Sequence, residues 1–170
     1  MKLIYVRHGE VAIPNGPLSE RGKLQAEGVI DYIAPENPVK IYCSPQLRAR
    51  QTAEIIARGL NLEIEIMPEF DERLRVELEK DEELVVENNY FNYDYENSKI
   101  QTCRDFIEKN FKGFYKIIEN HKDKNESVII VAHSSTSYAL ATFVNGVPAN
   151  RKIVWMQCSN CAVIKFFVEN

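Results

Sequence analysis

An apolar run that stops at a charged triplet restricts the fold of this chain more than any other feature. Residues 3–6 read Leu-Ile-Tyr-Val, and Arg7-His8-Gly9-Glu10 follow at once. Short runs rich in β-branched and aromatic residues that end at a glycine are typical of buried strands leading into a loop. In open α/β sheets, chemistry gathers at the carboxyl ends of strands, where Arg7 and His8 would lie. By itself the triplet is also compatible with ordinary end-of-strand sequence, because three residues recur by chance.

Two other stretches repeat this arrangement farther along the chain. Residues 128–132 are apolar and end at His133, which two serines follow. Between the two histidine motifs, residues 42–53 break a strand at a Ser-Pro pair and begin a helix that carries Arg48 in its first turn. Arginine offers planar, permanently charged donors to phosphate oxygens, and a neutral imidazole can attack phosphorus. Two histidines and two arginines at strand ends therefore predict an anion site that contains a nucleophile.

Alternating strand and helix patterns predict a three-layer α/β/α fold around a mostly parallel sheet. Strand–helix–strand units pair their strands in parallel through right-handed crossovers. The chain of 170 residues has room for one domain with a proper core, residues 1–170. The expected strands are one that ends at residue 7, 39–43, 62–66, one that begins at 128 and 162–168; the expected helices are 19–33, one that ends near 59, 100–119 and 136–144.

The ordered motifs resemble those of the histidine phosphatase superfamily, the phosphoglycerate mutase-like phosphatases. They follow the family's order and span nearly the whole chain. The matching pieces are Arg7-His8-Gly9-Glu10, Pro17-Leu18-Ser19-Glu20-Arg21-Gly22 with Gln25-Ala26, Ser44-Pro45 with Arg48-Ala49 and Gln51-Thr52-Ala53, and Val131-Ala132-His133. The resemblance implies the same three-layer fold and a phosphomonoester hydrolase that needs no cofactor.

The resemblance also implies a role for each matched charged residue. His8 corresponds to the nucleophile that forms a phosphohistidine, which divides one difficult displacement into two. His133 corresponds to the second histidine, which stabilises the equatorial oxygens, and Arg7 and Arg48 correspond to phosphate-binding arginines. Two rival functions stay open: phosphoglycerate mutase-type phosphoryl transfer, and a catalytically silent phospho-ligand-binding domain. The intact set of four residues argues against silence.

Two glutamates compete for the proton donor that the family places after its third strand. A carboxyl group of raised pKa beside the phosphate can protonate the leaving oxygen. Glu72 follows the bulky Phe70 by two residues, at a distance from Thr52 that suits the family. Glu77 stands one residue too far from Leu74, and the strand period places it on the opposite face. We therefore favour Glu72, although the glycine that relatives often carry soon after this acid is missing.

Two further candidate phosphate-binding residues depart from the family's pattern. Asn15 lies about one residue later than the asparagine that touches phosphate in many relatives. Ser134 stands where relatives usually have glycine, so its hydroxyl would narrow the pocket or add a donor.

The rhythm of strands and helices breaks after residue 69, and residues from about 77 to 99 form an acidic, aromatic insertion. The aromatic side chains are Tyr90, Phe91, Tyr93 and Tyr95. A solvated insertion is one interpretation, and a lid over the strand ends is the other. Long irregular segments inside compact domains are usually functional or disordered, and this one is too aromatic for plain disorder, so we favour a lid.

Composition narrows the partners and the compartment. With 21 basic and 25 acidic residues, the net charge of −4 gives no basic footprint for nucleic acid. Only four apolar residues separate Lys2 from Arg7, too few for a signal peptide, and no run approaches the roughly 18 apolar residues of a membrane span. We expect a cytoplasmic protein that acts on a small phosphorylated metabolite and binds neither nucleic acid nor membrane. The sequence does not indicate the oligomeric state.

Other cysteine, histidine and carboxylate residues give no sign of a metal or redox site. No cluster of these side chains has ligand spacing, which predicts a metal-independent enzyme. Cys158 and Cys161 have CxxC spacing but precede a strand, so we expect small buried residues at a strand start. His121 lies in a polar stretch, residues 120–125, and we expect it to be solvated.

Overall fold

In the computed structural model, five strands form one sheet among the described residues, which are 1–73, 80–153 and 158–168. The strands are β1 (Lys2–Arg7), β2 (Pro38–Cys43), β3 (Ile64–Ile66), β4 (Ser127–Ala132) and β5 (Val163–Phe167). Their order in the sheet is β3-β2-β4-β1-β5. The β1, β2 and β3 strands run parallel to the central β4, and β5 runs antiparallel beside β1. The predicted mostly parallel sheet is confirmed.

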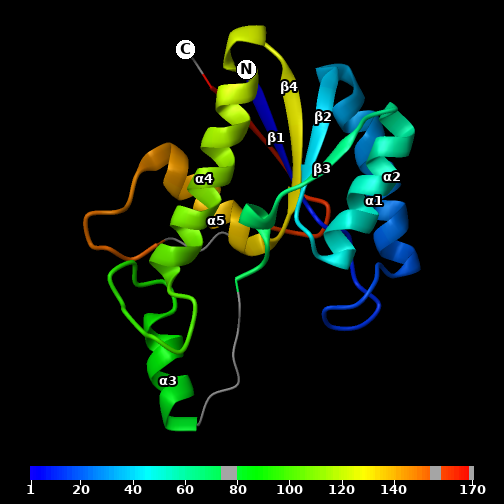
Figure 1. Cartoon of the computed structure of the whole chain (residues 1–170). Coiled ribbons are helices and arrows are strands. Elements are labelled where there is room, and N and C mark those ends of the chain that lie inside the picture. Colours follow the sequence, from blue (N-terminus) through cyan, green and yellow to red (C-terminus); the bar gives the residue numbers. More distant parts are fainter. Residues whose placement is uncertain (74–79, 154–157, 169–170) are drawn as a thin grey trace.

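Helices cover both faces of this sheet and complete the predicted three layers (Figure 1). They are α1 (Glu20–Ile33), α2 (Leu47–Leu60), α3 (Lys80–Asn89), α4 (Cys103–His121) and α5 (Ser134–Asn145), with short 3-10 turns at Ala34–Glu36, Pro68–Phe70 and Lys122–Lys124. Side chains alternate along each strand, so β1 sends Ile4 into a core with α1 and α2, and Tyr5 into a core with α4 and α5. Because both faces are covered, β1 and β4 are apolar almost throughout.

Side-chain caps explain where α1 and α4 begin. Ser19 accepts a hydrogen bond from the Gly22 amide and starts α1. A reciprocal capping box between Thr102 and Asp105 starts α4, three residues later than predicted. The α5 helix starts two residues earlier than predicted, at Ser134. His133, which is still extended, is the residue that precedes its first turn. This early start brings the first turn of α5 directly against the end of β4.

The acidic insertion contains a helix, whereas the sequence suggested an irregular segment. The described part holds α3, and the chain then runs beside residues 150–153. The Tyr93 amide donates to the Arg151 carbonyl at 2.9 Å, and the Ile153 amide donates to the Phe91 carbonyl at 2.8 Å. The carboxylate of Asp94 pairs with both Arg104 and Arg151. The insertion is therefore fixed to two other parts of the chain; residues 77–79 of its predicted range lie outside the described residues.

The prediction that His121 is solvated is wrong. Its side chain is 7% exposed at the end of α4. Its Nε2 lies 2.8 Å from the Tyr42 hydroxyl, and its Nδ1 lies 2.6 Å from a Glu126 carboxylate oxygen. The missed signal is helical period: His121 follows the buried Phe114 and Ile117 at intervals of three and four residues, so it faces the sheet despite its polar neighbours.

The four cysteines are free thiols. Cys158 is buried and Cys161 is half-buried just before β5, close to the predicted small buried residues at a strand start. Within the part of the chain that the structure describes, no helix is both long and apolar enough to cross a membrane.

Candidate active site

His8 lies immediately after β1, where its ring can present only one nitrogen to a ligand. The His8 amide donates to the Ala132 carbonyl at 2.9 Å, which holds it beside the end of β4. The ring Nδ1 lies 2.7 Å from the Gly9 carbonyl oxygen. A carbonyl oxygen only accepts, so Nδ1 carries the proton and Nε2 keeps its lone pair. The side chain is 6% exposed, and this tautomer makes Nε2 the available nucleophile.

The glycine after His8 is required by close packing of two backbone segments. A Cβ on Gly9 would lie 2.5 Å from the Gly22 carbonyl oxygen, and a Cβ on Gly22 would lie 2.1 Å from the Glu10 carbonyl oxygen. The Gly9 amide donates to Thr52 Oγ1 at 3.0 Å. The glycines of two separate motifs therefore bring the loop after β1 against both α1 and α2.

Arg48 extends from the first turn of α2 to the nucleophilic nitrogen. Its Nε–H donates to His8 Nε2 at 3.2 Å, and its Nη2 lies 3.9 Å from a Glu72 carboxylate oxygen. Arg7, at the end of β1, donates from Nη1 to the Cys158 carbonyl. Among the described residues, Arg48 Nη1 and Arg7 Nε are buried without a hydrogen-bond partner. Buried donors are rarely left unpaired, so these two groups are ready to bind an anion.

His133 is fully buried at the end of β4, and its ring meets that of His8. The ring centroids are 5.4 Å apart, with the planes at 61°. His133 Nε2 lies 2.7 Å from Ser44 Oγ, which itself accepts a hydrogen bond from the Gln46 amide. The serine hydroxyl can thus donate to Nε2, which leaves the proton of His133 on Nδ1. That Nδ1 lies 3.4 Å from a Glu72 carboxylate oxygen.

Glu72 follows the 3-10 turn Pro68–Phe70 and points at His133 and Arg48. One carboxylate oxygen accepts from the Ser135 hydroxyl and from the Arg73 amide. Burial raises the pKa of Glu72, and the Arg73 amide and Arg48 oppose this effect. A carboxyl group of raised pKa beside two imidazoles is suited to donate a proton. The competing Glu77 lies outside the described residues.

Both imidazoles are neutral near pH 7. Burial lowers the pKa of His8 to about 4, and the Arg48 and Arg7 guanidinium groups act in the same direction. Burial lowers the pKa of His133 to about 2, with Arg48 as the next contributor. The site is therefore positive through its arginines and not through its histidines.

The two less regular candidates have different surroundings. Asn15 sits in the exposed loop between β1 and α1 with a left-handed φ of 57°, and among the described residues no hydrogen bond or ion pair joins it to the site. Ser134 is the first residue of α5, beside His133, and its Oγ is buried without a partner among the described residues. An unpaired hydroxyl at a helix N-terminus suits an anion, so Ser134 has the better surroundings of the two.

Sequence reasoning missed several polar residues of this site. Gln46 donates to the Asp71 carboxylate at 2.7 Å, and Asp71 accepts from the Glu72 amide at 2.9 Å. Lys109 Nζ donates to the Asp71 carbonyl at 3.1 Å, and burial lowers the pKa of Lys109. Ser44 and Gln46 lie in or directly beside the matched Ser-Pro motif, and Asp71 and Ser135 each adjoin a predicted site residue. Lys109 has no such neighbour in the sequence and is brought to the site by packing.

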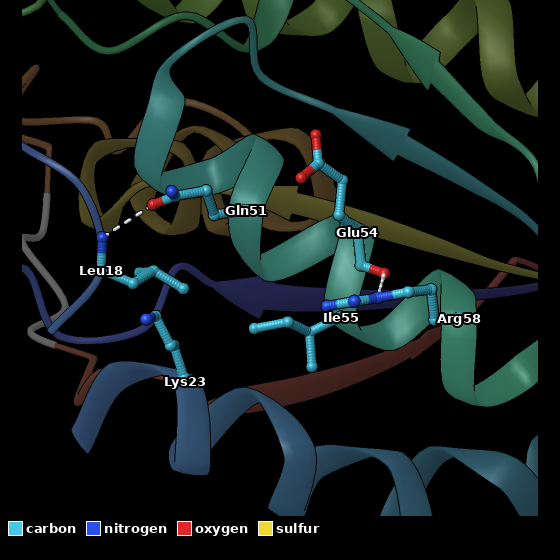
Figure 2. Close-up of a pocket in the computed structure, with 6 residues that line it drawn as sticks. All are labelled: Leu18, Lys23, Gln51, Glu54, Ile55 and Arg58. Carbon is cyan, nitrogen blue, oxygen red and sulfur yellow. Dashed lines mark hydrogen bonds between the residues drawn. The ribbon is translucent and has the colours of Figure 1, made fainter. Parts of the chain in front are cut away.

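The described part of the site holds no metal cluster, and the small pocket that the structure does show lies elsewhere. In the described ranges, no group of three or more His, Cys, Asp or Glu side chains is arranged to hold a metal ion. A small pocket lies between α1 and α2 (Figure 2). Its lining residues are Leu18, Lys23, Gln51, Glu54, Ile55 and Arg58. This pocket contains none of the side chains gathered around His8.

The chain is similar to known phosphatases in sequence and in fold. It is 30% identical over 155 residues to the uncharacterized phosphatase PhoE of Bacillus subtilis, covering 83% of this chain and 76% of that protein. The structure of YhfR from Bacillus stearothermophilus matches with a TM-score of 0.84 at 19% identity, covering 99% of this chain and 91% of the other. A phosphoserine phosphatase from Entamoeba histolytica, in complex with 3-phosphoglyceric acid, matches with a TM-score of 0.75 at 21% identity, covering 98% and 90%.

The family model of the histidine phosphatase superfamily (branch 1) matches residues 3–170. Hydrolysis of phosphomonoesters is the activity that the family and its phosphatase members support, and mutase transfer is not better supported. The predicted fold family and the predicted hydrolase class are confirmed. With the match extending over nearly its entire length, the chain belongs to the histidine phosphatase superfamily.

Proposed function

We propose that this chain hydrolyses phosphomonoesters of small metabolites through a phosphohistidine formed on His8, without a metal ion. The observation that carries the proposal is the geometry of His8: a neutral ring whose Nδ1–H is held by the Gly9 carbonyl and whose Nε2 faces Arg48. A neutral, oriented imidazole is a competent nucleophile toward phosphorus. Mutase transfer would use the same atoms and is the alternative that the experiment must separate.

The first half-reaction transfers the phosphoryl group to the ring. His8 Nε2 attacks phosphorus while the bond from phosphorus to the ester oxygen breaks. Glu72 gives its proton to that oxygen, so the leaving group departs as a neutral alcohol. The His8 ring keeps its proton on Nδ1, and the Gly9 carbonyl stabilises the positive charge that develops there.

The second half-reaction hydrolyses phospho-His8 and regenerates the free enzyme. Water attacks the phosphorus of phospho-His8 and gives a proton to the Glu72 carboxylate, and the bond from phosphorus to Nε2 breaks. Inorganic phosphate leaves, His8 is again neutral and Glu72 is again protonated. Because the same carboxyl group serves as acid and then as base, its raised pKa suits both steps.

Fixed donors stabilise the transferring group in both steps. We expect the unpaired N–H groups of Arg7 and Arg48 and the Nδ1–H of His133 to donate to the phosphoryl oxygens, with the Ser134 hydroxyl as a further donor. Asn15 would join them only if its loop moves toward bound phosphate. Preorganised donors of this kind supply the positive charge that a metal ion gives in other phosphatases.

The substrate class and location follow as part of the same proposal. A small phosphorylated metabolite is supported by the 3-phosphoglyceric acid bound to the Entamoeba relative. A reducing compartment such as the cytoplasm is supported by four free cysteines, three of them buried.

The test compares wild type with His8→Asn on p-nitrophenyl phosphate, with EDTA present and absent. His8→Asn should lose turnover, and only wild type should form a phosphoryl adduct that is acid-labile and base-stable. His121→Gln is the matched control, because His121 is also buried but contacts Tyr42 and Glu126 instead. Retained turnover in His8→Asn would refute the nucleophile. Exchange between 3- and 2-phosphoglycerate faster than phosphate release would favour the mutase.

A further inference from the structure

Arg73 follows the proposed proton donor directly and is almost completely buried. Its side chain is 3% exposed. The guanidinium group donates from Nη1 to the Tyr90 carbonyl at 2.6 Å and from Nε to the Gln101 carbonyl at 3.2 Å. It also stacks on the Tyr90 ring, with 3.8 Å from the guanidinium carbon to the ring centroid. A buried guanidinium held by two carbonyls and a ring has one fixed position.

The two carbonyls belong to the first and last residues of one segment, residues 90–101. Within it, the Phe91 carbonyl and the Tyr93 amide bond to residues 151–153, and the Phe91 ring meets the Tyr138 ring of α5 edge-on at 5.6 Å. The segment is thus joined to α5 and to residues 150–153. The Arg73 side chain binds both ends of the segment, and Arg73 directly follows Glu72 in the chain.

The backbone of Arg73 contacts the proton donor itself. The Arg73 amide donates to a Glu72 carboxylate oxygen at 3.2 Å, and the Ser135 hydroxyl donates to the same oxygen. We expect a displacement of the Arg73 side chain to shift its backbone amide, and with it this hydrogen bond to Glu72. Proton donors act within a narrow range of positions, since misplacement by about 1 Å can cost 10²-fold in rate.

We propose that Arg73 is a positioning residue that couples the 90–101 segment to the Glu72 carboxyl group, its backbone amide orienting the acid and its side chain anchoring the segment. This role rests on the proposed function of Glu72. It predicts that loss of the Arg73 side chain harms proton donation more than it harms phosphate binding or attack by His8.

Several charged groups besides Arg73 act on Glu72 and must stay unchanged in a test. Arg48 from α2 and Arg7 from β1 favour its ionised form, and Asp71 opposes it. His133, directly after β4, and Lys109, on α4, also face it. Burial is the largest cause of the raised pKa of Glu72.

The experiment measures Arg73→Gln, Arg73→Lys and wild type on an alkyl phosphate and on p-nitrophenyl phosphate. The alkyl leaving group needs the proton, whereas nitrophenolate needs little help. For Arg73→Gln we expect kcat to fall about 10–100-fold on the alkyl phosphate and less than about threefold on p-nitrophenyl phosphate. KM should change little on either substrate, because the role of Arg73 concerns proton donation and not phosphate binding. Arg73→Lys keeps a cation that cannot bond both carbonyls, so its losses should be intermediate.

Arg104→Gln is the matched control. Arg104 pairs with Asp94 and Glu96 of the same segment from its solvent side and does not contact Glu72. Equal losses of kcat on both substrates would overturn the role of Arg73, and so would an identical pattern in Arg104→Gln. If Arg73→Gln does not fold, Arg73→Lys decides by the same criteria. Absence of phosphohistidine in wild type would refute the proposed function itself, and this role with it.

Discussion

Two buried, neutral histidines should make the folded chain sensitive to mild acid. The pKa of His8 is about 4 and that of His133 about 2, whereas a histidine in the unfolded chain titrates near 6.5. Between those values the unfolded state binds more protons than the folded state, so stability rises with pH and is lost as pH falls. The loss begins near pH 6.5 and for His8 is complete below about pH 4.

The magnitude follows from linkage. Each tenfold difference in proton affinity is worth about 1.36 kcal/mol, so from pH 7 to pH 4.5 each ring costs roughly 2.5 kcal/mol of unfolding free energy. The two rings together cost roughly 5 kcal/mol, which is comparable to the whole stability of many domains. Carboxylates of lowered pKa, such as Glu36 and Glu65, add losses in more acidic solution that are shared by every variant.

The assay is urea unfolding followed by circular dichroism at pH 7, 6, 5 and 4.5. His8→Asn keeps a donor that can reach the Gly9 carbonyl, and His133→Gln keeps a polar group facing Ser44. Each variant should lose roughly 2.5 kcal/mol less than wild type between pH 7 and 4.5, and the double variant roughly 5 kcal/mol less. Each protein is compared with itself at pH 7, which removes the cost of the substitution. Parallel curves for wild type and the double variant would refute neutral buried imidazoles.

Three other predictions concern catalysis. Glu72→Gln should lower kcat on alkyl phosphates by roughly 10²–10⁴-fold and less on p-nitrophenyl phosphate; the same pattern in Glu77→Gln alone, in a kinetic comparison of both variants, would reverse the assignment. Activity should persist in EDTA and be inhibited by vanadate, whose trigonal form mimics the transferring group; restoration of EDTA-treated enzyme by a divalent ion would contradict this. Across a metabolite panel, kcat/KM should be highest for one phosphate on an uncharged or aromatic body, and highest values for phosphoglycerates would count against it.

The substrate prediction depends on the negative charge of the acidic insertion, which the structure shows to be partly compensated. The sequence offers only Lys80 as a base between residues 77 and 96, which predicts repulsion of polyanions. The structure adds Arg104 and Arg151, which pair with Asp94 from outside the insertion. Part of the acidic charge is therefore compensated, so the preference should be weaker than charge counting along the sequence suggests.

Sequence patterns predicted most of the fold because its elements are locally determined. The β1 and β4 strands are covered on both faces and read as continuous apolar runs that end at His8 and His133. Since carboxyl ends of parallel strands meet at one edge of the sheet, the motifs also predicted that these two rings would lie together. The helix in the insertion was missed because α3 has a weak apolar stripe among its acidic residues.

The remainder of the site depends on contacts between distant parts of the chain. Ser135 reaches Glu72 across 63 residues of sequence, and Lys109 reaches Asp71 across 38. No local sequence pattern indicates that a serine or a lysine on a helix will bond to a residue this far away in the chain. His121 shows the same limit. Its polar neighbours predicted a solvent-exposed side chain, whereas the helical period directs it toward the sheet, where it contacts Tyr42.

The contact between Arg48 and His8 determines what the substrate must do on binding. In the structure the Arg48 Nε–H donates to His8 Nε2, the atom that must attack phosphorus in the proposed reaction. Attack requires that this hydrogen bond be released. Phosphoryl oxygens carry negative charge and accept from guanidinium more strongly than a neutral imidazole does. A bound phosphate monoester should therefore draw the Arg48 donors to its own oxygens and free the lone pair of His8, so that the nucleophile becomes available only when its target is in place.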